Sequence, residues 1–397
     1  MKPEDFSASA PGQIIRTPEG HAAFLPDPLP PKLGFSLATM HLLSEADRAL
    51  GQLAGVGETL PNPHLLIGPF LRREAVLSSR IEGTITTPVE LLLFEVAPSE
   101  EPKPPDVREV ANYVRALETG LARLAELPVC LRLIRETHGI LLEGARGGKH
   151  RPGEFRQNQN YIGRPDRPIA EARFVPPPVP QMAVALDAFE RFLQQGSGYP
   201  FLVDLALLHY QFEAIHPFMD GNGRIGRLLI PLLLSEKGIL PQPLLYLSAY
   251  FERNRDSYVD LLLRVSQAGV WEEWIQFFLK GVADQARDAL HRSRKLLSLR
   301  QEYRMRMQQA RASALVLRLV DELFSHPALT ASGARQRLGV THRSAQLNIE
   351  KLEKVGILKE YTGRQRNRVY VATGILGIIG EDESAPPAGS DKLATGN

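Results

Sequence analysis

The stretch HPFMDGNGRIGR, residues 216–227, combines one histidine, one acid, two arginines and three glycines within twelve residues. It lies between two apolar segments, VDLALLHYQFEAI (203–215) and LLIPLLL (228–234). This pattern predicts one helix that ends near Ile215 and another that begins near Asn222. A short polar turn rich in glycine is costly between two buried helices, so the stretch indicates a binding site.

The turn has the properties of an anion site. Gly221 and Gly223 leave backbone N–H groups uncovered by side chains, and the N-terminus of the following helix carries partial positive charge. Arg224 and Arg227 lie three residues apart on that helix and should share a face, from which their guanidinium groups can bind phosphate oxygens. We therefore expect a ligand that carries phosphate groups.

Asp220 and His216 add chemistry to this site. Asp220 would repel phosphate unless a cation lies between them, and Mg²⁺ favours one carboxylate combined with phosphate oxygens. A neutral His216, with an ordinary pKa near ~6.5, can take a proton from an attacking hydroxyl. These residues predict group transfer from a nucleoside triphosphate, without the GxxxxGK[ST] pattern of a P-loop. Glu213 and His216 could instead be half of a metal site, but further ligands are not evident in the sequence.

The stretch matches the Fic family pattern HPFx[D/N]GNGRxxR at every defined position, and the chain resembles that family. The resemblance implies a mainly α fold, in which a helical core carries a β-hairpin flap. It also implies transfer of AMP from ATP to a Tyr, Thr or Ser hydroxyl of a protein, which can be the chain itself, with release of pyrophosphate. His216 would be the base and Asp220 would hold Mg²⁺. The other ATP-binding residues implied by the motif are Pro217, Phe218, Met219, Gly221, Asn222, Gly223, Arg224 and Arg227.

The same resemblance gives individual residues their roles. Asn222 and Gly223 would contact the α- and β-phosphates, and Arg227 would reach the γ-phosphate. Relatives that transfer phosphate carry a lysine near the second glycine of the motif, so Gly223 favours transfer of AMP. Phe218 is expected to pack beneath the loop and anchor it.

Two residues outside the motif are candidates for the nucleoside end of the pocket. By the same resemblance Tyr258 would face the adenine, and the alternative is a tyrosine of the core. Gln211 is a polar residue on a mostly apolar helix, upstream of His216. It is a candidate for lining the nucleotide pocket.

SSRIEG, residues 78–83, matches the pattern [S/T]xxxE[G/N] of relatives with an inhibitory helix, through Ser78, Glu82 and Gly83. A carboxylate placed against Arg227 would occupy the group that the γ-phosphate needs, so ATP would bind only in a non-productive pose. The alternative is an ordinary surface glutamate. In some relatives the same glutamate positions water for the removal of AMP, so the resemblance also implies a reverse reaction.

Helical periodicity dominates the chain, and changes of character divide it. Residues 152–180 have no helical period, which indicates a hairpin or an extended loop. By the resemblance this is the flap, around 157–175, beside which an extended segment of a target protein would align. The predicted division is an N-terminal helical region with the inhibitory motif (1–105), a Fic core (106–290), a helical connector (291–310), a winged helix-turn-helix (311–373) and a disordered tail (374–397).

The winged segment is locally basic, although the net charge of the chain is only +2. Residues 330–372 contain nine Lys or Arg against three Glu. Arg343 lies on the expected recognition helix, and the tip TGRQRNR holds three more arginines, where they suit phosphate contacts on DNA. The alternative is a winged helix that docks a protein or forms a homodimer.

Composition places the chain among soluble globular proteins, with 43% hydrophobic and 23% charged residues. The single cysteine, Cys130, excludes an intramolecular disulfide and suits a reducing compartment. The first residues lack the apolar core of a signal peptide, and no apolar run approaches the ~20 residues that span a bilayer. We therefore expect a cytoplasmic protein without a membrane partner.

Two hypotheses from different classes follow. The first is a self-inhibited protein adenylyltransferase that uses ATP and Mg²⁺. The second is a DNA-binding regulator whose Fic core senses nucleotide and does not transfer it. The intact His216 and Asp220 argue against the second, because a sensor needs no base.

Overall fold

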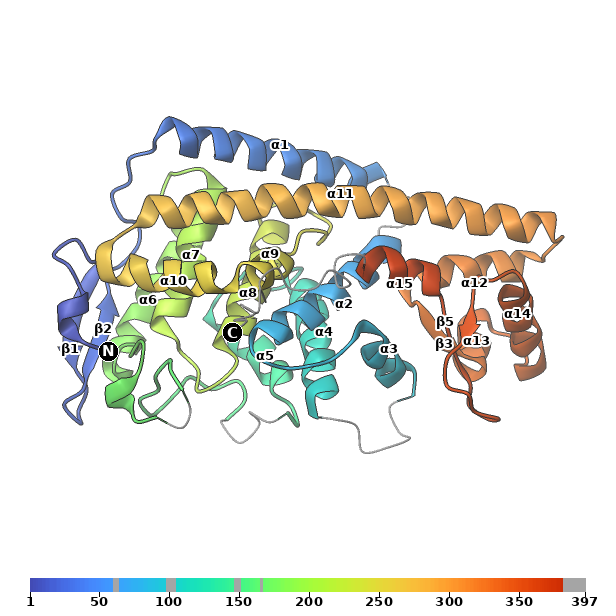
Figure 1. Cartoon of the computed structure of the whole chain (residues 1–397), viewed down its shortest axis with the longest axis horizontal. Coiled ribbons are helices and arrows are strands. Elements are labelled where there is room, and N and C mark those ends of the chain that lie inside the picture. The colour runs from blue at the N-terminus through green and yellow to red at the C-terminus, as the bar shows by residue number, and fades with distance from the viewer. Residues whose placement is uncertain (60–63, 98–104, 146–150, 165–166, 381–397) are drawn as a thin grey trace, which may run out of the picture. The chain divides into compact units, whose positions relative to one another are not determined.

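The chain forms two compact units, residues 1–293 and 294–397, and the boundary falls inside the long helix α11 (Trp271–Gln309). Both units are mainly helical, as the sequence predicts (Figure 1). The computed structural model describes residues 1–59, 64–97, 105–145, 151–164 and 167–380.

The first unit begins with an antiparallel hairpin of β1 (Gly12–Arg16) and β2 (Ala22–Pro26). The prediction that residues 1–105 form a helical region is therefore wrong at its start. Tertiary contacts stabilise these short strands, since the Phe24 N–H donates to the Val175 carbonyl at 2.9 Å. The helices that follow are α1 (Leu37–Thr59), α2 (His64–Ile81), α3 (Pro88–Val96), α4 (Pro105–Arg123), α5 (Leu131–Leu141), α6 (Val179–Gln195), α7 (Phe201–Ile215), α8 (Asn222–Glu236), α9 (Ser248–Arg253) and α10 (Arg255–Ala268), with short 3₁₀ turns at Pro3–Asp5 and Ile169–Glu171.

Helices α7 and α8 form the centre of this unit. Nearly every residue of α7 is buried, as its almost continuous apolar sequence requires. The Trp274 indole of α11 reaches this core and donates to the Ala206 carbonyl of α7 at 2.9 Å. In Figure 1, α1 lies along the first half of α11, where Arg287 pairs with Glu45 at 3.2 Å. The loop between α7 and α8 is therefore held by the most buried helices of the unit.

The segment between α2 and α3 is tied to α4. The Thr84 hydroxyl donates to Glu109 at 3.1 Å, and the Ile85 N–H donates to Asp106 at 3.0 Å. Thr87 then caps α3, because its hydroxyl accepts from the Glu90 N–H while the Glu90 carboxylate accepts from the Thr87 N–H. These contacts fix the course of the chain just after Glu82.

The second unit has the order of elements predicted for a winged helix-turn-helix. After α11 come α12 (Ala314–Ser325), β3 (Ala328–Thr330), α13 (Ala331–Leu338), α14 (His342–Lys354), β4 (Lys359–Glu360), β5 (Val369–Val371) and α15 (Thr373–Gly380). The small sheet is antiparallel, in the order β3-β5-β4. Thr330 and Thr341 cap α13 and α14 through their hydroxyls.

The prediction of a disordered tail from residue 374 is wrong for its first residues. The sequence TGILGIIG forms α15, in which Ile375 and Ile379 are buried. Burial of these isoleucines stabilises a helix that a composition argument over the whole tail does not reveal. The rest of the predicted tail lies outside the described residues.

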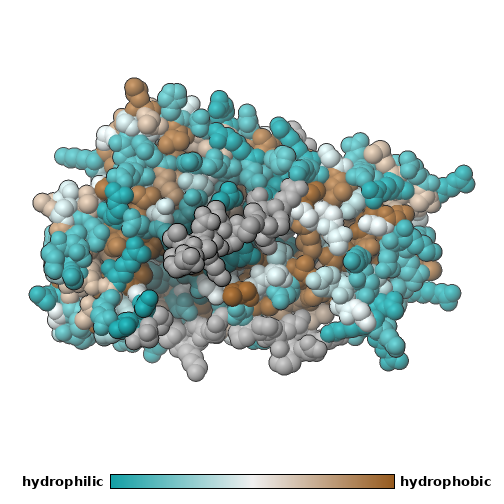
Figure 2. Space-filling view, in the orientation of Figure 1, coloured by the Kyte–Doolittle hydropathy of each residue, from teal (hydrophilic) through white to brown (hydrophobic). Residues whose placement is uncertain are grey.

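The face of the molecule in Figure 2 is mainly hydrophilic, with hydrophobic residues scattered among charged ones. This distribution is ordinary for protein surfaces. Among the described residues, no helix combines the length and the apolar character needed to cross a membrane.

Replacing Thr87 by alanine should destabilise the first unit by about 1 kcal/mol, because the Glu90 N–H in the first turn of α3 loses its acceptor. Thr87→Ser is the matched control, since it keeps the hydroxyl. Urea unfolding followed by circular dichroism measures the difference. Equal stability of the two variants would show that the capping box does not contribute.

Candidate functional site

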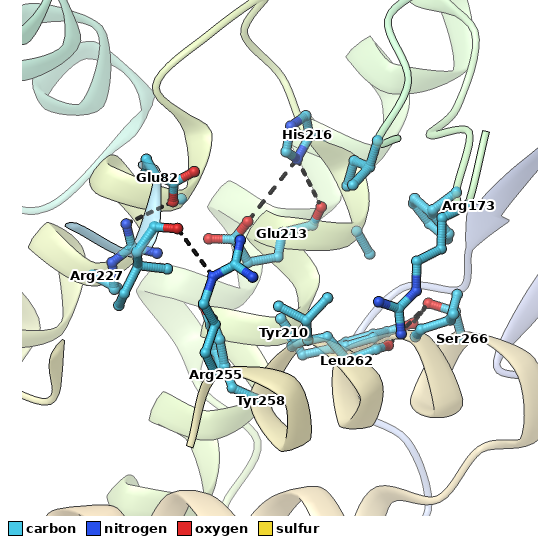
Figure 3. A pocket seen from close by; sticks show the side chains of 17 residues that line it. Glu82, Arg173, Tyr210, Glu213, His216, Arg227, Arg255, Tyr258, Leu262 and Ser266 are labelled. Atoms are coloured by element: carbon cyan, nitrogen blue, oxygen red, sulfur yellow. Dashed lines mark hydrogen bonds and ion pairs between the residues drawn. The ribbon is translucent and has the colours of Figure 1, made fainter. Parts of the chain in front are cut away.

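A cavity of about 220 Å³ opens beside the polar loop between α7 and α8. Its walls come from α7, α8, α10, the segment after α2 and the strand-like pieces around Ile162 and Phe174. Figure 3 shows the charged side chains that converge on it. The lining residues with chemistry of their own are Glu82, Arg173, Tyr210, Glu213, His216, Arg227, Arg255, Tyr258 and Ser266.

His216 ends α7 in a left-handed conformation, with φ 50° and ψ 60°. A residue with a Cβ adopts this conformation at a cost, and such residues are frequent at functional sites. The Nδ1–H donates to the Glu213 carbonyl at 3.2 Å, so the lone pair of the neutral ring lies on Nε2. Burial lowers the pKa of His216 to about 4, although the bond to Glu213 acts to raise it. The imidazole is therefore neutral at pH 7 and can accept a proton.

Helix α8 begins at Asn222, as predicted, after Gly221 with φ 81°. Asn222 does not face the cavity: its Oδ1 accepts from the Phe218 N–H and its Nδ2 donates to the Phe218 carbonyl, each at 2.8 Å. Phe218 is fully buried and stacks on His138, with ring centroids 3.7 Å apart. Phe218 thus packs beneath the loop, as expected for an anchor, and Asn222 closes the loop.

Arg227 is a buried cation on the cavity wall, and Ser78 and Glu82 both contact it. Its side chain is only 2% exposed. Nε donates to the Ser78 hydroxyl and Nη2 to the Ser78 carbonyl, both at 2.9 Å. Nη2 also donates to Glu82 at 2.7 Å (Figure 3). The structure thus brings the motif of residues 78–83 onto Arg227, in the contact that the resemblance implies.

The charge of Arg227 favours the ionised form of Glu82. Burial acts to raise the pKa of Glu82, but the charge of Arg227 and its hydrogen bond outweigh burial, and the pKa lies below its usual value. Glu82 is therefore a carboxylate at neutral pH. It still exposes 40% of its side chain, so a competing anion can reach the pair.

Arg224 and Arg227 do not act from one face as predicted. Arg224 is not among the residues that line the cavity, and it contacts Glu109 at 3.3 Å and Asp220 at 3.2 Å. The carboxylate of Asp220 is 42% exposed, and its Oδ1 also accepts from the Gly221 N–H at 2.6 Å. Two acids, Glu109 and Asp220, therefore hold Arg224, and it is not on the cavity wall where a ligand would bind.

Glycines at two motif positions leave room for carboxylates. A Cβ on Gly223 would lie 2.2 Å from Oε1 of Glu82, and a Cβ on Gly226 would lie 2.3 Å from Oε1 of Glu213. Any side chain at either position would displace these acids. The spacing of the glycines therefore reflects packing as well as exposure of backbone N–H groups.

From the sequence, Glu213 is a candidate only for half of a metal site, together with His216. Burial raises its pKa to about 8, so the carboxyl is protonated at neutral pH. Oε2 lies 4.0 Å from Nδ1 of His216, and Oε1 is buried without a hydrogen-bond partner in the described part of the chain. No group of three metal-binding side chains gathers among the described residues.

The two candidates for the nucleoside end differ from expectation. Gln211 does not line the cavity; its amide donates to the Asp27 carbonyl at 3.0 Å and joins the core to the N-terminal segment. Tyr258 does line it, but its hydroxyl bonds to Nε2 of His209 at 2.8 Å and its ring stacks on Phe251. Tyr258 thus belongs largely to the core, which was the alternative interpretation.

Several lining residues were not anticipated, because they come from distant elements. Arg255 at the start of α10 donates to the Ile81 carbonyl at 3.2 Å, and Arg173 pairs with Asp260 at 3.4 Å. Tyr210 and Ser266 share a hydrogen bond of 2.9 Å. No local pattern marks these residues, and only the folded chain brings them to one cavity.

The segment predicted as a flap, around 157–175, contains one antiparallel bridge and the 3₁₀ turn at Ile169–Glu171. Ile162 and Phe174 pair antiparallel, with an N–H to carbonyl distance of 2.8 Å, and both line the cavity. Pro217, Met219 and Gly221 lie in the loop but not on the cavity wall. Of the motif, the wall includes only His216, Gly223 and Arg227.

Comparison with known proteins identifies two regions of the chain that match a known family. The sequence model of the Fic/DOC family N-terminal region matches residues 40–122, and that of the Fic/DOC family matches residues 128–234. The curated proteins called protein adenylyltransferase Fic of Drosophila ananassae and Drosophila mojavensis are 41% and 40% identical over 91 and 92 residues, which is 22% of this chain. The matched part is only 16% of the length of either relative.

A solved structure shares the fold over a larger part of the chain. The crystal structure of a Fic family protein from Desulfovibrio desulfuricans G20 superposes with a TM-score of 0.54, at 19% identity, and covers 87% of this chain and 99% of its own. The motif and the two matched models lead to one conclusion: residues 40–122 and 128–234 carry the N-terminal region and the domain of the Fic/DOC family, and the solved structure shows a shared fold.

Proposed function

We propose that the protein is a self-inhibited adenylyltransferase that moves AMP from ATP to a hydroxyl of a protein. The observation that carries this proposal is the arrangement of one cavity, in which a neutral His216 and a buried Arg227 lie on the wall together and Glu82 covers the arginine. Relatives named protein adenylyltransferase support the choice of AMP. The target can be another protein or the chain itself.

The chain's own groups suggest how the step proceeds. The target hydroxyl attacks the α-phosphorus of ATP, Nε2 of His216 takes its proton, and pyrophosphate leaves as the P–O bond to it breaks. The γ-phosphate binds Arg227 in the place that the Glu82 carboxylate otherwise occupies. The N-terminus of α8, which begins just after Gly221, adds partial positive charge for the phosphates.

Asp220 fits Mg²⁺, because it is a partly exposed carboxylate at the edge of this helix start. Mg²⁺ commonly takes one carboxylate and completes its shell with phosphate oxygens and water. When bound, the ion would neutralise charge on the phosphates. Asp220 would have to share or give up its contact with Arg224, which Glu109 would continue to hold.

The pair of Ile162 and Phe174 supports docking of the target on the segment around 157–175. Their antiparallel pairing places extended backbone on the wall of the cavity, where a target segment could add main-chain hydrogen bonds. The reverse reaction is a further part of the proposal, since the exposed part of Glu82 lies on the same wall as His216.

Replacing Glu82 by glycine should raise transfer of labelled AMP to protein at least ~10-fold, because Arg227 becomes free for the γ-phosphate, an interaction worth well over a factor of ten when charges are buried. Glu126→Gly, at a glutamate that is 68% exposed on the surface, is the control and should leave transfer unchanged. The assay counts label on protein after incubation with ATP and Mg²⁺. Tight ATP binding by Glu82→Gly without any transfer would instead support the nucleotide-sensing regulator.

In the Glu82→Gly background, His216→Ala should lower transfer by about 10² to 10⁴-fold, because no other group on the wall is placed to accept the proton. ATP affinity, measured by calorimetry, should change little, since the imidazole contributes chemistry more than binding. Transfer that survives without the imidazole would exclude its role as the base.

The second unit supports a further binding function, and we propose that it binds DNA. Arg343 on α14 and the tip residues Arg364, Arg366 and Arg368 are exposed, so basic side chains stand on both the helix and the hairpin of the winged order. The homodimer and protein docking remain alternatives for this unit.

Arg343→Gln combined with Arg366→Gln should weaken binding to duplex DNA. If both side chains contact phosphates, the slope of log affinity against log salt should become shallower by about 1.8. Fluorescence anisotropy across salt concentrations measures it, with Arg123→Gln in the first unit as control. An unchanged slope would exclude these phosphate contacts.

A further inference from the structure

Arg156 is a buried cation that the proposed reaction does not use. Its residue is 3% exposed, and it does not line the cavity. Its guanidinium donates only to backbone carbonyls: to His216 at 3.1 Å, to Asn158 at 3.3 Å and to Pro177. Within the described part of the chain, no carboxylate pairs with it.

An unpaired buried charge is costly, and a neutral donor could satisfy the same carbonyls at lower cost. Burial already lowers the pKa of Arg156 to about 10, which leaves it charged at neutral pH. The comparison with Arg227, which is equally buried but has Glu82 as its partner, shows that this fold does pair other buried arginines. We therefore expect the charge of Arg156 to have a function that a neutral donor would not fulfil.

The contact with His216 gives that role a location. His216 occupies the left-handed conformation at the end of α7, where its carbonyl has left the helix ladder. Arg156 Nε and Asn160 Nδ2 both donate to this carbonyl, at 3.1 and 3.3 Å. The Arg156 N–H also donates to the Pro217 carbonyl at 2.9 Å. The backbone N–H and the side chain of Arg156 thus both donate to carbonyls of the left-handed turn at His216.

We propose that Arg156 is a positioning residue for the transfer reaction, which fixes the backbone turn of His216 through its carbonyl and opposes protonation of the imidazole through its charge. This inference rests on the proposed function, in which His216 is the base. The low pKa of His216, about 4, agrees with it, since Arg156 lowers that pKa after the larger effect of burial.

The other charged or titratable groups around His216 act in both directions. Glu82 and Asp220 act to raise its pKa. Glu213 is protonated at neutral pH, and Arg227 on α8 is neutralised by Glu82. Arg156 is therefore the cation that offsets these two acids in the parent chain. In the Glu82→Gly background Asp220 is the acid that remains and Arg227 loses its partner, so both arginines then oppose protonation of the imidazole. Removal of the Arg156 charge should still let the imidazole hold a proton at higher pH.

Two substitutions separate charge from geometry, both made in the Glu82→Gly background. Arg156→Gln removes the charge and keeps a donor, so the acid limb of kcat/KM against pH should move up by about one pH unit. Arg156→Lys keeps the charge but cannot reach three carbonyls, so the limb should stay in place while kcat falls about 10-fold. ATP affinity should stay unchanged in both, because Arg156 lies off the cavity wall.

Arg292→Gln is the matched control, since Arg292 is a buried arginine on α11 whose ion pair is with Asp288 at 2.8 Å. It should lower the melting temperature without moving the acid limb. An acid limb in Arg156→Gln that coincides with the parent overturns the electrostatic role, and an unchanged kcat in Arg156→Lys overturns the positioning role. Should Arg156→Gln fail to fold, the lysine variant alone decides whether Arg156 positions His216.

The design distinguishes two failures. If Glu82→Gly itself transfers no AMP, the proposed function is wrong whatever the arginine variants do. If Glu82→Gly transfers AMP and both Arg156 variants match it in pH profile and kcat, only the present inference is wrong.

Discussion

Burial of the Arg227 guanidinium is the constraint on which the site depends. Only 2% of the Arg227 side chain is exposed, and its charge would cost several kcal/mol if the anion beside it were removed without replacement. Glu82 is that anion, and the hydroxyl and carbonyl of Ser78 accept two further hydrogen bonds from Arg227. A phosphate group can replace the carboxylate, since both are anions whose oxygens accept paired hydrogen bonds from a guanidinium group. The same requirement that stabilises the folded chain therefore links the proposed inhibition to the proposed binding of ATP.

The loop that presents His216 is held from several directions. Asn222 closes it from within through Phe218, and His138 supports it from α5, where its Nε2 bonds to the Asp220 carbonyl at 3.0 Å. Nδ1 of His138 accepts from the Gly153 N–H at 2.9 Å, which leaves the proton on Nε2. Because these partners belong to separate elements, the left-handed turn at His216 is determined by the fold around it rather than by its own sequence.

The extent to which the sequence predicts this site differs from residue to residue. The ends of α7 and α8 and the contact between residues 78–83 and Arg227 could be predicted, because the motif and the apolar flanks specify them. The partners of Asn222 and Arg224 could not, since both side chains suit phosphate. Whether they face a ligand depends on acceptors such as Glu109, which is distant in the sequence and marked by no local pattern.

The same limit applies to the fold outside the motif. The hairpin of β1 and β2 is stabilised by Val175, and Gln211 is turned inward by Asp27, so each depends on a contact across the unit. Helix α15 depends on the burial of two isoleucines within a segment whose composition is otherwise that of a tail. Local patterns identify helices and motifs well, and long-range contacts decide the strands and the direction of polar side chains.

Burial near the cavity keeps two histidines and one carboxyl group neutral, and this has a cost that depends on pH. Burial lowers the pKa of His209 to about 3 and that of His216 to about 4, so the folded chain binds fewer protons than the unfolded chain between these values and about 6.5. Stability is therefore lost as pH falls through this range. Glu213 acts in the opposite sense, because its raised pKa favours the folded chain at low pH and this contribution is lost as pH rises from about 4.5 through about 8. The neutral imidazole of His216 at pH 7 and the pH dependence of stability thus have one cause. Loss of stability on the acid side comes from the imidazoles and on the alkaline side from the Glu213 carboxyl, because the same low-dielectric packing surrounds these groups.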